Sequence, residues 1–220
     1  MGNFSTESRK PAPWSRAGKF AAAAALTVLL AACATPKPTG PLLLHPVPPT
    51  VENYTLSQGA IVFSGPGFSV SARPWDYRLV ADEFRRSGEP CPFGDDDAQV
   101  GRFLFFRVLL ENRSTRTLIF NPMRASLLIE GEAPLTALEN SDLFAFAGEE
   151  QAAAEARGRA FRRVSFDITA TIRPGQTLER YLVFRSPDEP PRQTTLALDD
   201  LWLGTKSFDL KYAFEAFPGK

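Results

Sequence analysis

Residues 164–185 read VSFDITATIRPGQTLERYLVFR, and this stretch indicates the fold class. Apolar and polar residues alternate from Val164 to Ile172, which is the period of a strand with one buried face. Residues 173–176 place Pro at the second and Gly at the third position of a turn, as a type II turn prefers. Residues 177–185 then predict the returning strand. The stretch therefore predicts a β-hairpin.

Further strands are predicted on both sides of this hairpin. Residues 103–110 are apolar on both faces, which predicts a central strand covered on both sides. Alternating or short apolar segments add 60–63, 68–73, 117–120, 125–130, 194–203 and 208–216. About nine strands at short spacing, with Gly, Pro and Asn between them, favour an immunoglobulin-like antiparallel β-sandwich. The chain is therefore predicted to be mainly β.

Two segments predict short helices inserted into this sandwich. Tyr77, Val80, Ala81 and Phe84 follow the i, i+3, i+4, i+7 spacing of an amphipathic helix. Residues 149–159 are rich in Ala, Glu, Gln and Arg, which are good helix formers. Between the first helix and the central strand, the chain predicts only an irregular loop.

The N-terminal 32 residues have the composition of an export signal. Four basic residues and one acidic residue precede the uncharged run 20–32, which ends in small Ala31 and Ala32. That run is too short for a transmembrane helix, which needs about 20 apolar residues. A buried helix is the alternative. We expect cleavage between Ala32 and Cys33, with a covalent lipid on Cys33 that anchors the chain to a membrane.

Residues 33–49 are predicted to tether the anchor to a domain spanning 50–220. Six prolines between 34 and 49 disfavour helix and sheet and favour an extended polyproline conformation. Sixteen such residues would reach about 50 Å. His45, the only histidine of the chain, lies in this tether.

Composition restricts the possible functions. Removal of residues 1–32 leaves 21 basic and 24 acidic side chains, a net charge of −3, which argues against nucleic acid as a partner. With Cys33 lipidated, Cys91 is a lone thiol, either buried or available to an intermolecular partner. No rigidly held histidine is expected, so histidine-dependent nucleophilic catalysis and histidine zinc sites are disfavoured. We expect no enzyme and no cofactor apart from the lipid.

Two charged clusters are weak candidate sites. Asp95, Asp96 and Asp97 could contribute to a calcium site, although a solvated acidic loop is the favoured reading. Basic side chains could form a patch for an anionic partner, with internal pairing to Glu149, Glu150 and Glu155 favoured instead; they are Arg157, Arg159, Arg162 and Arg163. Trp75 and Trp202 are expected in the core rather than on exposed binding surfaces.

The order of these segments resembles uncharacterised bacterial lipoproteins with a single immunoglobulin-like domain. The features that carry the resemblance are Leu30-Ala31-Ala32-Cys33, the proline-rich tether, and the segments 103–114, 120–122, 173–176 and 182–184. The resemblance implies that the turns at 112–114 and 173–176 are scaffold features. Ala34 is not the aspartate typical of inner-membrane retention, so the resemblance also implies an outer-membrane location facing the periplasm.

Two hypotheses of function follow. The first is a structural or protein-interaction module that meets an envelope protein partner on a flexible tether. The alternative is a binding module for a small molecule, glycan or lipid, with residues 77–84 and 143–163 at the rim of a pocket.

Overall fold

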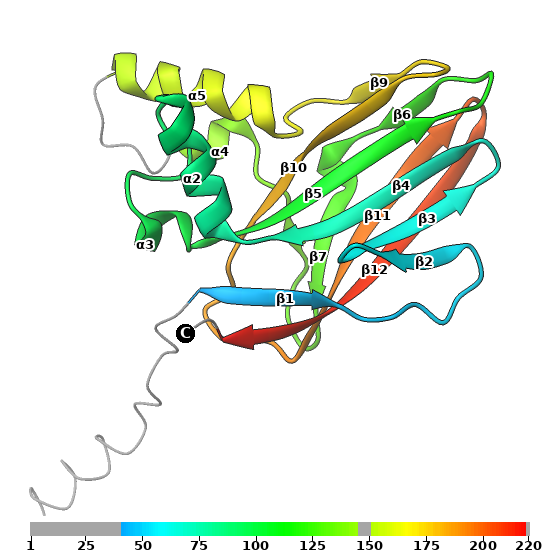
Figure 1. Cartoon of the computed structure of the whole chain (residues 1–220), viewed down its shortest axis with the longest axis horizontal. Coiled ribbons are helices and arrows are strands. Elements are labelled where there is room, and N and C mark those ends of the chain that lie inside the picture. Colours follow the sequence, from blue (N-terminus) through cyan, green and yellow to red (C-terminus); the bar gives the residue numbers. More distant parts are fainter. Residues whose placement is uncertain (1–40, 145–150, 219–220) are drawn as a thin grey trace, which may run out of the picture. The chain divides into compact units, whose positions relative to one another are not determined.

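The computed structural model describes residues 41–144 and 151–218, which form two antiparallel sheets with a few short helices (Figure 1). The first sheet has seven strands: five lie in the order β1-β12-β11-β6-β9, β7 also pairs with β11, and β8 pairs with β7. The second has five strands in the order β10-β5-β4-β3-β2. The predicted mainly-β class is confirmed. Twelve strands are seen in the described part of the chain, more than the nine or so expected.

The bounds of the elements are as follows. The first sheet contains β1 (Leu42–Pro46), β6 (Leu118–Phe120), β7 (Ala125–Ile129), β8 (Leu135–Thr136), β9 (Ala170–Ile172), β11 (Gln193–Leu203) and β12 (Lys206–Pro218). The second contains β2 (Tyr54–Ser57), β3 (Ala60–Gly65), β4 (Phe68–Trp75), β5 (Phe103–Asn112) and β10 (Thr177–Arg185). The helices are α2 (Tyr77–Ser87), α3 (Asp97–Val100), the 3-10 turn η1 (Pro122–Arg124), α4 (Asn140–Phe144) and α5 (Gln151–Val164). Among the described residues, none of these helices is both long and apolar enough to cross a bilayer.

The main core lies between the two sheets. β5 is paired on both sides, with β4 and β10, and its inward-facing Phe106, Val108 and Leu110 are fully buried, as the sequence predicts for a central strand. Tyr212 of β12 crosses this core, and its hydroxyl donates to the carbonyl oxygen of Val70 over 3.0 Å. Each large apolar side chain buried in this way contributes about 1.5–3 kcal/mol to folding.

A second core lies on the outer face of the second sheet, under α2, α3 and α5 (Figure 1). In α2 the four residues predicted to face inward are all buried, and the helix begins with Asp76 accepting from the N–H of Arg78. Phe93, from the loop before α3, inserts among the aromatic rings, and its centroid lies 4.8 Å from that of Phe105. The irregular loop is therefore fixed to the sheet by one aromatic side chain.

The turn at 173–176 is confirmed, but the hairpin predicted around it is wrong. The N–H of Gln176 donates to the Arg173 carbonyl over 3.0 Å, and Gly175 has a φ of 76°. However, β9 before the turn pairs with β6, whereas β10 after it pairs with β5. The turn therefore carries the chain from one sheet to the other.

The strand predicted over 164–172 is reduced to its last three residues. α5 continues to Val164, and Ile168, predicted to face the core, is 76% exposed. Ala160, Phe161 and Val164 extend a helical spacing into this segment and pack on the second core. Because the helical spacing buries Phe161 completely, this segment forms a helix and not the strand that the alternation predicts.

Asn112 links the ends of the two sheets. Its side chain is buried at the end of β5, and its Nδ2 donates to the carbonyls of Arg116 and Ile172 over 2.7 and 2.8 Å. Its Oδ1 accepts from the N–H and the hydroxyl of Ser114. Asn112 thus satisfies backbone groups between β5 and β9, which belong to different sheets and do not pair with each other.

The predicted tether is wrong for its last part. Residues 42–46 form β1, which pairs with β12, and His45 lies opposite Glu215 with its ring 5.3 Å from that of Phe217. Prolines are tolerated here because β1 is an edge strand, whose outer N–H groups need no partner. The predicted signal peptide, the cleavage site at Ala32 and Cys33, and residues 34–40 lie outside the described residues.

Candidate functional site

The three consecutive aspartates do not converge on one point. Asp95 accepts two bonds from Nη2 of Arg157, at 2.8 and 2.9 Å. Asp96 caps α3 by accepting from the N–H of Gln99, and Asp97 forms an ion pair with Arg85. Within residues 41–144 and 151–218, no group of three or more His, Cys, Asp or Glu side chains could hold a metal ion. The geometry therefore gives the calcium hypothesis no support.

The four arginines of the predicted patch are dispersed along α5. Arg157 and Arg163 form ion pairs with Asp95 and Glu89, which are not the acidic residues expected from the sequence. Glu149 and Glu150 lie outside the described residues. Arg159 and Arg162 are exposed on the same helix. At least one partner of each pair is open to solvent, so each pair contributes about 0–1 kcal/mol to stability.

Cys91 lies at the rim of the second core. Its side chain is half-buried, and burial raises the pKa of the thiol. The N–H groups of Phe93 and Gly94 and the nearby Arg157 lower that pKa by smaller amounts. At neutral pH the group is therefore held as a thiol, the form that does not act as a nucleophile.

The two tryptophans differ in their surroundings. Trp202 lies on the outer face of the first sheet and is 41% exposed, so the expectation of a core position is wrong. Trp75, at the end of β4, is half-buried and contacts the second core. The guanidinium carbons of Arg73 and Arg107 lie 4.8 and 5.0 Å from its ring centroid.

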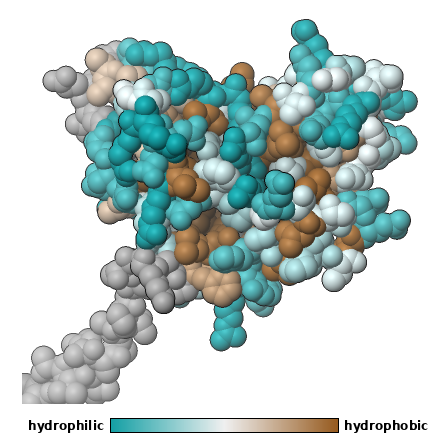
Figure 2. All heavy atoms as spheres, in the orientation of Figure 1, coloured by the Kyte–Doolittle hydropathy of each residue, from teal (hydrophilic) through white to brown (hydrophobic). Residues whose placement is uncertain are grey.

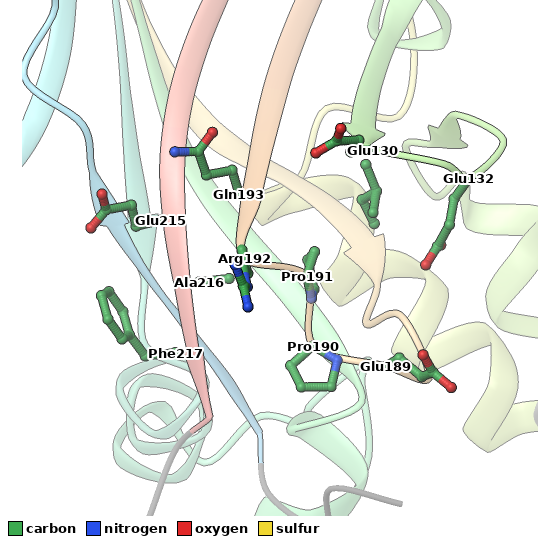
Figure 3. Close-up of a pocket in the computed structure, with 11 residues that line it drawn as sticks. Glu130, Glu132, Glu189, Pro190, Pro191, Arg192, Gln193, Glu215, Ala216 and Phe217 are labelled. Atoms are coloured by element: carbon green, nitrogen blue, oxygen red, sulfur yellow. The ribbon is translucent and has the colours of Figure 1, made fainter.

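A groove of about 710 Å³ lies at the end of the first sheet where β11 begins and β12 ends (Figure 3). Three segments far apart in the sequence form it: the turn after β7, the residues before and at the start of β11, and the last residues of β12. The lining residues are Ile129, Glu130, Glu132, Glu189, Pro190, Pro191, Arg192, Gln193, Glu215, Ala216 and Phe217.

Four glutamates line this groove, which we call the acidic groove. Backbone hydrogen bonds fix its shape. The N–H of Ala216 donates to the carbonyl of Arg192 over 3.0 Å, which holds the two strand ends together. The N–H of Glu132 donates to the Ile129 carbonyl over 3.2 Å and closes the turn after β7, where Gly131 has a φ of 81°. Such a φ favours glycine, so the position of Glu132 depends on that residue.

The charge of the acidic groove is strongly negative. Four glutamates and one arginine line it, and all five are exposed. In Figure 3, Glu130, Glu132 and Glu189 lie to one side of Arg192, and Glu215 lies to the other. Within the described part of the chain, no ion pair joins Arg192 to any of these carboxylates. The four carboxylates and the one guanidinium give the lining a formal charge of −3.

No comparison with known proteins assigns a family. No family model matches the chain, and no curated protein matches it. Among solved structures, the yjhA protein from Bacillus subtilis is 14% identical over 50% of this chain and 72% of its own, with a TM-score of 0.31. That protein is a distant likeness.

Proposed function

We propose that this chain is a lipid-anchored protein of the bacterial envelope whose β domain, an immunoglobulin-like scaffold, binds a partner protein and carries out no catalysis. Export by residues 1–32, cleavage after Ala32 and lipidation of Cys33 deliver it to the outer membrane, facing the periplasm. The N-terminal composition supports the anchor, since a basic segment precedes a short apolar run that ends in Leu-Ala-Ala-Cys.

The acidic groove is the main observation that supports binding of a partner protein. Its four carboxylates suit a positively charged segment of a partner. Phe217, which is 45% exposed, suits an apolar side chain beside that charge. Complementary charge of this kind increases association rate and selects the partner. The occupant we propose is therefore a basic segment of an envelope protein.

The short distance from the anchor supports a partner close to the membrane. Because β1 begins at Leu42, only eight residues separate it from Cys33. Fully extended, those nine steps along the chain span about 30 Å, well below the reach of about 50 Å that a tether ending at Pro49 would have.

Mild-detergent purification of the lipidated protein from its own membranes tests the proposal. We expect one partner in stoichiometric amount, lost when Glu130, Glu189 and Glu215 are all changed to Gln. Glu52→Gln, an exposed change far from these residues in sequence, is the matched control and should keep the partner. Cys33→Ser should abolish membrane attachment and reduce recovery of the partner. A wild-type protein that always purifies alone contradicts the proposal.

A cationic small molecule is the second candidate occupant. The groove volume of about 710 Å³ falls in the usual range of ligand sites, which favours this reading. Polyamines and basic dipeptides should then raise the melting temperature in proportion to ln[L] above the Kd, with the triple glutamine variant unresponsive. If no compound in such a panel shifts the melting temperature, the partner protein remains the proposal.

A further inference from the structure

Two arginines lie directly opposite each other on the exposed face of the second sheet. Arg73 of β4 and Arg107 of β5 are partners in the antiparallel register, and both side chains point away from the core between the sheets. Like charges in directly opposed positions destabilise a strand pair. This face is the one seen in Figure 2, where charged and apolar side chains are mixed without one dominant apolar area.

The indole of Trp75 holds both guanidinium groups in place. Their distances of 4.8 and 5.0 Å from the ring centroid are those of cation–π contacts. Trp75 itself is fixed by the second core, so the two arginines rest on a rigid support. Arg73 also approaches the β2–β3 turn, since a Cβ built on Gly59 would lie 3.7 Å from its Nε.

Only one of the two arginines, Arg107, has a carboxylate partner. Nη2 of Arg107 lies 2.7 Å from a carboxylate oxygen of Glu179. No carboxylate in the described ranges lies within ion-pair distance of Arg73, whose side chain is exposed. Two cations and one anion leave a formal charge of +1 on a domain that is otherwise acidic.

We propose that Arg73 and Arg107 form a binding site for a phosphate oxyanion, either a free anion or the phosphate of a lipid headgroup. The planar guanidinium fork matches the two oxygens of such groups, and one bound negative charge neutralises the excess and relieves the repulsion between the arginines. The site is independent of the acidic groove, which lies at the end of the other sheet and carries the opposite charge.

The same oxyanion chemistry can come from a free anion or from a lipid headgroup, and two probes distinguish them. Purified full-length protein is titrated with inorganic phosphate or with glycerophosphoglycerol, the deacylated headgroup of phosphatidylglycerol, at constant ionic strength. Thermal melting and tryptophan fluorescence are recorded together, since Trp75 lies under both arginines. We expect saturable changes in both signals for at least one probe.

Variants test which residue carries the binding. Arg73→Gln should weaken the apparent affinity at least tenfold, and Arg73→Lys should give an intermediate loss, because it keeps the charge without the fork. Arg159→Gln, an exposed change on α5, is the matched control and should titrate like wild type. Tighter binding of glycerophosphoglycerol than of phosphate would assign the site to headgroups, and the reverse to free anions.

Two results would overturn the site. One is a wild-type protein whose melting temperature and fluorescence follow total salt alone, without saturation, for both probes. The other is an Arg73→Gln variant that folds, melts cooperatively and still binds with wild-type affinity. Either result would reduce the arrangement to a structural stack of two arginines on Trp75.

Discussion

The side-chain amide of Asn112, at the end of β5, donates to the carbonyl of Ile172, at the end of β9, over 2.8 Å. The two residues belong to different sheets, so this bond joins the sheets at one end of the core. The Asn-x-Ser turn that follows β5 is held by the same side chain, whose Oδ1 accepts from the N–H and the hydroxyl of Ser114.

Asn112→Ala should lower the free energy of unfolding by about 2–4 kcal/mol, because it leaves the buried carbonyl of Ile172 and the turn at Ser114 without their partner. Urea unfolding followed by far-UV circular dichroism measures the loss. Asn121→Ala is the control, since the side chain of Asn121 accepts from the N–H of Met123 at the exposed start of η1. A loss no larger than in this control would mean that water replaces the amide of Asn112.

Phe93→Ala should cost about 3–5 kcal/mol, the usual range for removing a buried phenylalanine. Its side chain is 4% exposed and contacts the rings of Phe84, Phe103, Phe105 and Phe161. Hydrogen exchange should increase first in α2 and α5, because these helices pack on the sheet through that ring. Phe217→Ala, at a 45% exposed position, should change stability little. Uniform acceleration over both sheets would contradict a separate second core.

Cys91 should react slowly with iodoacetamide at pH 8, because burial raises the pKa of its thiol and reduces the thiolate fraction. The rate should continue to rise with pH beyond the range of an ordinary cysteine. In Arg157→Ala the profile should move to still higher pH, since the nearby guanidinium lowers the pKa of Cys91. A Cys33→Ser background isolates the signal. A Cys91 that alkylates as fast as a free thiol at pH 8 would show that the loop opens.

The buried hydroxyl of Tyr212 should make the protein lose stability in alkali. Burial raises the pKa of this phenol well above 10.0, so the unfolded chain ionises first and unfolding releases a proton. The stabilisation is complete below about pH 10 and decreases above it, by about 1.4 kcal/mol per pH unit. Stability of Tyr212→Phe, measured from pH 8 to 11, should lack this part of the slope. Equal slopes for both proteins would refute the burial of an ionisable phenol.

Local spacing predicted the parts of the fold in which burial follows the period of one element. The apolar run at 103–110 and the four inward residues of α2 both lie where the sequence placed them. The alternation at 164–169 failed because Val164 also fits the helical spacing that buries Phe161. Local spacing also did not indicate which of the two sheets each strand joins. A Pro-Gly turn has the same local sequence whether it closes a hairpin or connects two sheets.

The acidic groove could not be predicted from the sequence. Its carboxylates come from the segments 130–132, 189 and 215, and only the pairing of β7, β11 and β12 brings these together. The oxyanion site was missed for the same reason, because Arg73 and Arg107 meet only through the register of β4 and β5. A shared calcium site was predicted because three aspartates are adjacent at 95–97. Their side chains instead contact different partners.

β1 determines how mechanical load would reach the domain. Its first residue, Leu42, follows directly on the segment that leads to the proposed anchor, and its register with β12 runs from Leu42↔Pro218 to Pro46↔Phe214. A pull along the axis of β1 strains all the β1–β12 hydrogen bonds at once, whereas a pull across it breaks them one after another. The direction in which an anchored chain is pulled would therefore decide whether this strand resists force or peels from the sheet.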